Sequence, residues 1–88
     1  MKIKQGFTLR NVANTNIIVP VSPETMNYKN MFSLNEPGAL LWRELEHGAE
    51  KEDLLRVLRS EYEVEELTAL RDVEEFLEKL RSFGALEE

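Results

Sequence analysis

Residues 34–48 read LNEPGALLWRELEHG, and this stretch decides the fold because the spacing of its apolar residues changes there from strand-like to helical. Asn35 is a favourable N-cap, Pro37 is tolerated in a first helical turn, and Gly48 is a suitable residue just beyond a helix end. Between them, apolar side chains recur at helical spacing at Leu41, Trp42 and Leu45. The stretch therefore predicts a helix over 36–47, with Trp42 in the core.

Two further amphipathic segments follow this helix. Residues 50–62 place apolar side chains on one side and charged side chains on the other, which predicts a second helix. Residues 65–83 predict a third and longer helix that Gly84 ends. Its apolar stripe consists of Leu67, Leu70, Val73, Leu77 and Leu80, with Phe76 and Phe83 at the flank.

Upstream of residue 34 the pattern is typical of strands. Residues 7–12 mostly alternate in polarity, residues 13–16 form a turn cluster, and residues 17–21 are β-branched, so the sequence predicts a hairpin. Pro20 cannot donate a backbone hydrogen bond and is expected at a strand end, at a bulge or with its nitrogen facing outward. Residues 27–34 are expected to form a third strand that pairs with the second, which leaves one of its edges unpaired.

These elements predict an α+β fold. Its expected form resembles a winged helix-turn-helix, with a three-stranded antiparallel sheet followed by three helices, in the order βββααα. The sequence shows no repeat, low-complexity tract or Gly/Ser linker, so residues 1–88 are expected to form a single domain with a few loose residues at each end.

Composition excludes several classes of function. The 88 residues include no cysteine, which excludes disulfides, iron–sulfur clusters and thiolate zinc sites. The net charge is −6, and residues 35–88 hold seven basic and sixteen acidic side chains, a balance of −9. Nucleic acid is therefore not an expected partner, because phosphate binding requires basic surfaces. No apolar stretch is long enough for a membrane span or a signal peptide, so we expect a cytoplasmic protein without membrane contact.

The titratable residues do not form a recognisable catalytic or metal-binding pattern. His47 is the only histidine, and its position near a helix end favours a role in interacting with the helix dipole. The acidic pairs at 65–66 and 74–75 are adjacent on helices and point in different directions, as expected for a charged helix surface. No nucleophile elbow, phosphate-binding loop or zinc motif is present. We expect no enzyme activity, no metal and no cofactor.

Five blocks of the sequence together resemble one family. They are GFTLR at 6–10, IIVPV at 17–21, LNEPGALLWREL at 34–45, EYEV at 61–64 and DVEEFLEKL at 72–80. The chain resembles the PqqD family, whose members are peptide chaperones, or recognition elements, for ribosomally synthesised and post-translationally modified peptides (RiPPs). The resemblance extends from about residue 6 to residue 87 and implies the same βββααα arrangement.

The resemblance also implies a function. Family members bind the leader segment of a precursor peptide as an added strand along the third β-strand, against the third helix, and present it to a modifying enzyme. That enzyme is expected to be a radical SAM maturase. The peptide-binding residues expected from the third strand are Tyr28, Lys29, Asn30, Met31, Phe32, Ser33 and Leu34. Those expected from the third helix are Leu70, Arg71, Val73, Phe76, Leu77 and Lys79, with the two basic side chains facing acidic leader residues.

Several alternatives remain open from the sequence. Leu70, Val73, Phe76 and Leu77 could belong to the core alone, and Arg71 and Lys79 could pair with neighbouring glutamates in solvent. The chain could act in lasso-peptide synthesis beside a leader peptidase. It could also be a self-pairing interaction module that forms a homodimer or swaps domains. A DNA-binding winged helix would require basic residues on the third helix, yet residues 64–88 hold three basic and eight acidic side chains.

Overall fold

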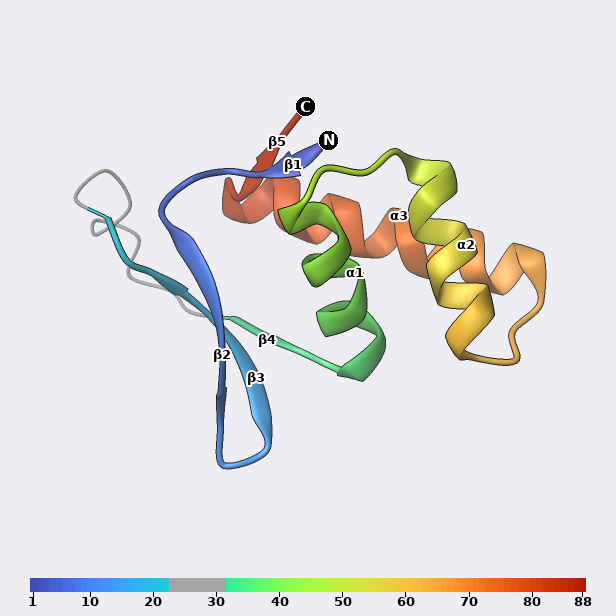
Figure 1. Ribbon diagram of the computed structural model, residues 1–88, viewed down its shortest axis with the longest axis horizontal. Helices are drawn as coiled ribbons and strands as arrows, with labels where there is room; N and C mark the ends of the chain where they lie inside the picture. The colour runs from blue at the N-terminus through green and yellow to red at the C-terminus, as the bar shows by residue number, and fades with distance from the viewer. Residues whose placement is uncertain (23–31) are drawn as a thin grey trace.

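The computed structural model of the protein describes residues 1–22 and 32–88 (Figure 1). In chain order the elements are β1 (Lys2–Ile3), β2 (Phe7–Val12), β3 (Thr15–Pro20), β4 (Phe32–Leu34), α1 (Glu36–Glu46), α2 (Lys51–Glu61), α3 (Glu66–Phe83) and β5 (Leu86–Glu87). The predicted α+β arrangement, a three-stranded antiparallel sheet followed by three helices, is confirmed. Each observed helix begins and ends within one residue of its prediction.

A tight turn connects β2 to β3. Ala13 and Asn14 have φ angles of 51° and 65°, and Val12 is paired with Thr15 across the turn. Two consecutive residues with positive φ are typical of the type I′ turn, whose twist matches that of a hairpin. The predicted hairpin is confirmed, but its turn is shorter than the predicted 13–16 because Thr15 begins β3.

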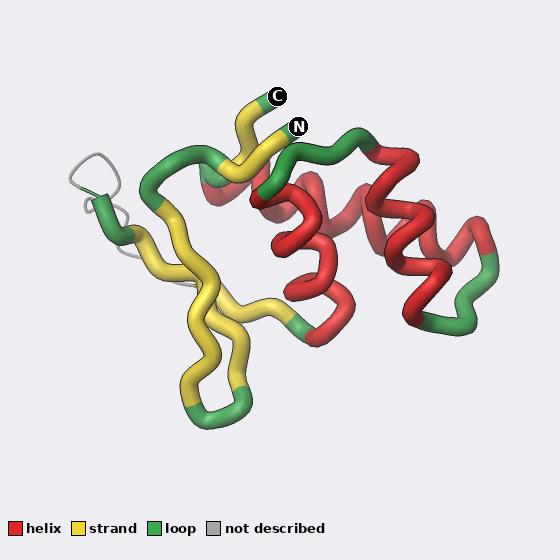
Figure 2. The backbone as a smooth tube through the Cα atoms, in the orientation of Figure 1, coloured by secondary structure: helices red, strands yellow, loops and turns green. Residues whose placement is uncertain are grey.

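The main sheet has the strand order β2-β3-β4, with both pairs antiparallel. Pro20 is the last residue of β3, which confirms a strand end as its position. Of the predicted third strand, residues 32–34 form β4, whereas residues 27–31 lie outside the described residues. Figure 2 shows the hairpin extending from one end of the molecule and the three helices packed together at the other.

The core joins the inner face of this sheet to all three helices. Ile18 from β3, Trp42 from α1 and Leu80 from α3 are each 0% exposed. Trp42 is thus a core residue, as predicted. Asn16 is the polar residue buried in this region, and its side chain accepts a hydrogen bond from Asn11 and donates one to Glu36, so its amide is satisfied on both sides.

The buried face of α3 differs from the stripe predicted from the sequence. Its buried residues are Ala69, Val73, Phe76, Leu77 and Leu80, whereas Leu67 is 74% exposed and Leu70 is half-buried. At about 100° per residue, Leu67 lies roughly 120° around the helix from Val73. The small Ala69 occupies the inward position in the first part of α3. The prediction that Leu67 belongs to the apolar stripe was therefore wrong.

Both ends of the chain are held in place. β1 and β5 form a two-stranded antiparallel sheet, with Ile3 opposite Leu86. The Arg81 guanidinium donates to the carboxylate of Glu88 at 3.0 Å, and this hydrogen bond lowers the pKa of Glu88. The expectation of loose residues at the termini was wrong, because backbone pairing between segments distant in sequence gives no local signal.

The junction between β4 and α1 explains part of the motif LNEPGA. The side chain of Asn35 accepts a hydrogen bond from the backbone N–H of Gly38 at 2.8 Å, which confirms Asn35 as the N-cap. A Cβ atom at Gly38 would lie 3.0 Å from this Asn35 oxygen and 3.3 Å from the Cβ of Leu34. The missing side chain of Gly38 therefore allows strand and helix to approach closely.

Replacing Asn35 with alanine is expected to destabilise the protein by about 1 kcal/mol, because the first turn of α1 would lose its side-chain acceptor. Asn35→Asp should retain most of the stability, since aspartate caps a helix N-terminus as well as asparagine does. Urea unfolding followed by circular dichroism measures both variants. Equal unfolding midpoints for wild type and the alanine variant would contradict the role of this cap.

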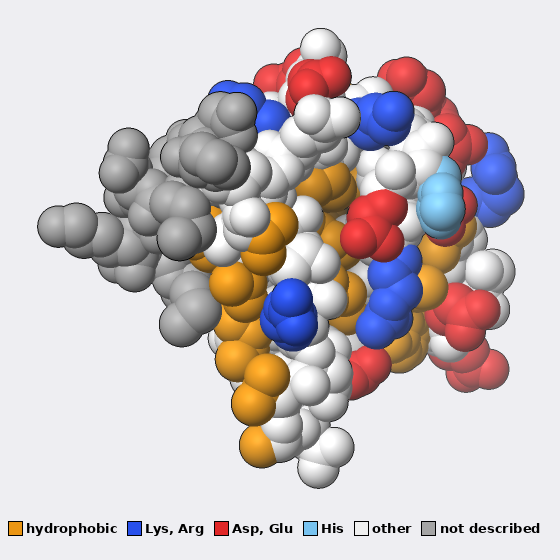
Figure 3. Space-filling view, turned by 60° about the vertical axis from the view of Figure 1, so that its left-hand side comes forward, with side chains coloured by type: hydrophobic (Ala, Val, Ile, Leu, Met, Phe, Trp, Pro, Cys, Tyr) orange, Lys and Arg blue, Asp and Glu red, His pale blue; other side chains and the backbone are white. Residues whose placement is uncertain are grey.

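Apolar and charged side chains occupy different parts of the surface. On the hairpin, Val12 and Val21 are 56% and 50% exposed, and Figure 3 shows apolar side chains extending along this region while charged side chains gather over the helices. Among the described residues, no helix is both long and apolar enough to cross a bilayer.

Candidate functional site

A groove of about 250 Å³ lies where β4 and the start of α1 face α3. Its lining residues are Leu34, Asn35, Pro37, Gly38, Leu41, Leu58, Asp72, Glu75, Phe76 and Lys79. Leu34, Leu41, Leu58 and Phe76 are buried core residues, so the floor of the groove is apolar. Its charged lining residues, Asp72, Glu75 and Lys79, all come from α3 and are exposed. The groove therefore combines an apolar floor with one charged rim.

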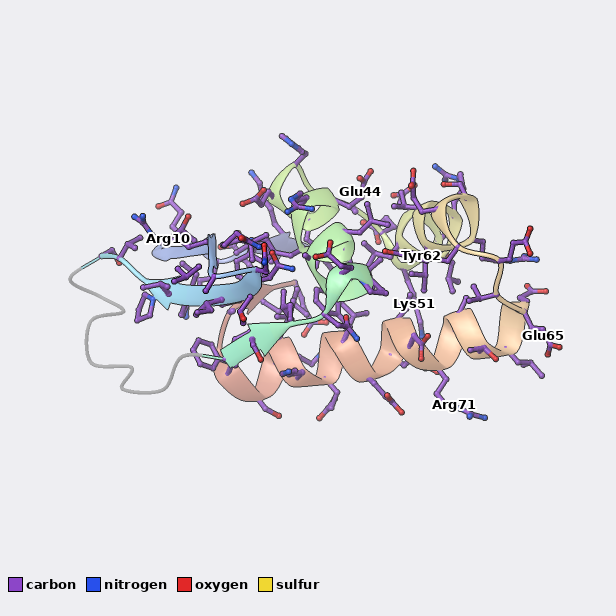
Figure 4. The ribbon with its side chains drawn as sticks, turned by 90° about the horizontal axis from the view of Figure 1, so that it is seen from below. Arg10, Glu44, Lys51, Tyr62, Glu65 and Arg71 are labelled. Carbon is purple, nitrogen blue, oxygen red and sulfur yellow. The ribbon has the colours of Figure 1, made fainter. Side chains whose placement is uncertain are left out.

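β4 borders this groove and lies at the edge of the sheet. Within the described residues it pairs with β3 alone, and Lys79 of α3 contacts its other edge. Ile18 lies opposite Phe32 and Ile17 lies opposite Ser33 in the ladder. Figure 4 shows β4 alongside α3, with the strand and the helix running in opposite directions.

The backbone of Ser33 faces the open edge. Its carbonyl oxygen accepts a hydrogen bond from Nζ of Lys79 on α3, at 3.1 Å, so this oxygen points away from β3. In an antiparallel strand the N–H and C=O of one residue point to the same side. We infer that the N–H of Ser33 faces the same edge, and that the backbone groups of Phe32 and Leu34 face β3.

Lys79 makes two contacts with β4. Besides the hydrogen bond to Ser33, its ammonium nitrogen lies 5.2 Å from the centre of the Phe32 ring, within the range of a cation–π interaction. Phe32 also contacts Phe83 edge-on, with ring centres 4.4 Å apart. A charged side chain that occupies an edge-strand acceptor protects the edge against unspecific pairing. In this structure Lys79 therefore covers the backbone position that an added strand would use.

The structure places the expected helix residues in three kinds of position. Phe76 and Lys79 line the groove, Val73 and Leu77 are 0% and 2% exposed in the core, and Leu70 is half-buried outside the groove lining. Arg71 is exposed and points outward from α3 in Figure 4. Only Phe76 and Lys79 of this set are thus brought to the edge of β4.

The expected strand residues divide in a similar way. Leu34 lines the groove, the Ser33 carbonyl accepts a hydrogen bond from the groove-lining Lys79, and Phe32 packs against the core beneath Lys79. The three residues of β4 alternate in burial: Phe32 is half-buried, Ser33 is exposed and Leu34 is buried. The remaining expected strand residues, Tyr28, Lys29, Asn30 and Met31, lie outside the described residues.

Sequence reasoning did not identify the part of the lining contributed by α1 and α2. Pro37 and Gly38 lie there because the strand turns directly into α1, and Leu58 reaches the groove floor from α2. The pairing of α2 with α3 brings Leu58 there, and no local pattern encodes it. Asp72 and Glu75 could have been found, since they precede Lys79 by seven and four residues and share its side of the helix.

Among residues 1–22 and 32–88, no group of three or more acidic or histidine side chains is arranged to hold a metal ion. The groove offers backbone hydrogen-bonding groups, an apolar floor and a few charges. These groups suit the binding of an extended peptide.

The fold and this groove define a small winged-helix-like domain in which one strand edge, beside a helix, is left unpaired by the described part of the chain. The chain belongs to the PqqD family: the model of that family, described as coenzyme PQQ synthesis protein D, matches residues 18–86. The resemblance inferred from the sequence blocks is thereby confirmed. No curated protein matches the chain.

Two solved structures are similar over nearly the whole chain. The first, TbiB1 in complex with the TbiA(beta) leader peptide, has a TM-score of 0.80 and 25% sequence identity, and the match covers 99% of this chain and 95% of that one. The second, lasso peptide synthetase B1 complexed with the leader peptide, has a TM-score of 0.78 and 22% identity, with 99% and 96% covered. At 22% identity, the similarity to the second structure supports the fold alone.

Proposed function

We propose that this protein binds the leader segment of a ribosomally synthesised precursor peptide and presents it to a modifying enzyme. The observation that carries the proposal is the outward-facing backbone of Ser33 at the edge of β4, beside a groove with an apolar floor. An extended peptide could add there as a strand, because main-chain hydrogen bonds supply affinity and side-chain pockets supply selectivity.

Two comparisons support this proposal. The chain belongs to the PqqD family, whose model is described as coenzyme PQQ synthesis protein D, and the similar TbiB1 structure contains a leader peptide. The geometry of the groove is consistent with the binding of a leader peptide. The apolar floor would receive alternate side chains of the leader, since residues two apart on a strand point to the same face.

In this proposal the protein acts as an adaptor and has no catalytic activity of its own. Its partner enzyme is, by family resemblance, a radical SAM maturase, with a leader peptidase of a lasso-peptide pathway as the alternative. The acidic character of residues 64–88 argues against nucleic acid as a partner. A cytoplasmic location and the possibility of a homodimer stay predictions from the sequence.

The expected affinity is moderate. One added strand buries a small interface, below about 1,200 Å² in total. Ordering the peptide costs about 2 to 5 kcal/mol of the gross interaction. We therefore expect a dissociation constant on the order of 1 μM, which corresponds to about −8 kcal/mol. Such an affinity allows the peptide to exchange between adaptor and enzyme.

An NMR titration tests the proposed function directly. The labelled protein is titrated with the leader peptide of the precursor encoded beside its gene. We expect the amide signals of residues 32–34 and 72–79 to shift together, because these residues border the groove, whereas signals from the β2–β3 turn stay unchanged. Shifts confined to another surface, or no shifts at millimolar peptide, would refute leader binding at β4. Size-exclusion chromatography of the same samples detects a homodimer.

A further inference from the structure

The rim of the groove carries opposite charges at its two ends. Lys79 lies at one end, against Ser33 and Phe32. Asp72 and Glu75 line the rest of the rim and form no ion pair within the described part of the chain. Other acidic residues of α3 differ from them, since Glu74 pairs with Lys51 and Glu78 pairs with Arg81.

Glu75 and Lys79 are four residues apart on α3, yet they form no ion pair with each other. A glutamate four residues before a lysine on a helix ordinarily forms a favourable pair. Here the Lys79 ammonium instead contacts β4. Among residues 1–22 and 32–88 the Glu75 carboxylate therefore has no ion-pair partner, and the Lys79 charge is directed at the strand edge. An incoming peptide N–H that takes the Ser33 carbonyl would release Lys79 for a new partner.

The spacing of these charges fits an extended chain. Four helical residues place Glu75 and Lys79 about 6 Å apart along the axis of α3. Side chains two residues apart on a strand lie on the same face and are separated by about 6.6 Å. Two alternate side chains of one peptide can therefore lie opposite Glu75 and Lys79 at the same time.

We propose that the groove selects its peptide by the order of two charges, with a basic side chain opposite Glu75 followed, two residues later, by an acidic side chain opposite Lys79. This inference rests on the proposed function and specifies its substrate. The order follows from the geometry. β4 and α3 run in opposite directions (Figure 4), so a peptide antiparallel to β4 passes Glu75 before Lys79. Antiparallel addition continues the pattern of the β2-β3-β4 sheet and is the slightly more stable pairing.

A pair of isomeric peptides tests the charge order. Two nine-residue peptides with blocked ends share one alternating apolar framework and one composition, and they differ only in whether lysine precedes glutamate by two positions or follows it. NMR titration to millimolar concentration measures both dissociation constants. We expect the lysine-first isomer to bind about three- to tenfold more tightly, since each exposed pair of opposite charges contributes modestly to binding and like charges oppose it to a similar extent.

Two protein variants make the test specific. The double variant Glu75→Lys/Lys79→Glu keeps the net charge and should invert the preference of the two isomers. A matched control, Arg59→Glu/Glu63→Lys, exchanges two charges outside the groove lining and should leave the preference unchanged. Circular dichroism confirms that each variant is folded.

Several results would overturn the charge order. They are equal binding of both isomers, tighter binding of the glutamate-first isomer, a preference that the groove variant does not invert, and the absence of binding by either isomer. In each case the titration with the natural leader reports separately on the proposed function. Leader shifts at residues 32–34 together with any of these results would leave leader binding intact and refute only the charge order.

Discussion

Replacing Ser33 with proline is expected to abolish leader binding while leaving the helical content of the protein unchanged. In the three-residue strand β4, Ser33 alone directs its backbone toward α3, as its hydrogen bond with Lys79 indicates. Proline removes the N–H that would donate to the peptide and places its ring at the docking edge. A buried peptide carbonyl left without its donor costs about 1–3 kcal/mol, which is roughly 5- to 150-fold in affinity, and the ring adds steric exclusion.

The same substitution should be tolerated by the sheet. Proline is accepted on an edge strand where its nitrogen faces away from the neighbouring strand, and β4 is such a strand. Ser33→Ala is the matched control, because it removes the hydroxyl group and keeps the N–H. Isothermal titration calorimetry with the leader peptide should detect binding to the alanine variant at nearly the wild-type affinity. Binding of the proline variant within threefold of wild type would refute strand addition at β4.

The sequence predicted the helical half of this fold well because each helix carries its own local signals. Asn35 caps α1, Gly84 ends α3 with a left-handed φ of 85°, and the apolar spacing defines the segments between them. The hairpin was equally local. The β1–β5 pairing was not, since it joins residues 2–3 to residues 86–87 through backbone groups that any sequence possesses.

The groove was predictable only in outline. Family resemblance indicated that the third strand and the third helix would meet, and Phe76 and Lys79 do line the space between them. The sequence could not separate Val73 and Leu77, which do not line the groove, from Phe76, which is also buried but lines it, because all three share the apolar face of α3. Only the depth of each side chain against α1, α2 and β4 separates them. The contact of Lys79 with the edge of β4 likewise depends on the tertiary structure, since the spacing along the helix predicts an ion pair between Lys79 and Glu75 instead.

Replacing Trp42 with alanine is expected to destabilise the protein much more than the loss of the Asn35 cap. Trp42 lies in the middle of α1 and is 0% exposed within the core that joins all three helices to the sheet. Removing such a side chain typically costs about 3–5 kcal/mol, from lost burial and from the cavity left behind. A domain of this length has a total stability of only about 4–13 kcal/mol. The midpoint of thermal unfolding should therefore fall by at least about 12 °C, measured by circular dichroism because this residue is the only tryptophan.

Leu67→Ala is the informative control, because it too truncates a large apolar side chain that the sequence pattern assigned to the core. Leu67 is 74% exposed, so its removal should change the stability by no more than about 0.5 kcal/mol. Trp42→Phe should cost less than Trp42→Ala, because phenylalanine fills most of the volume and the hydrogen bond lost with the indole goes to the exposed Glu46. Similar unfolding midpoints for Trp42→Ala and Leu67→Ala would contradict the placement of Trp42 in the core and of Leu67 at the surface. Trp42 also supports the groove floor, because its neighbour in α1, Leu41, lines the groove.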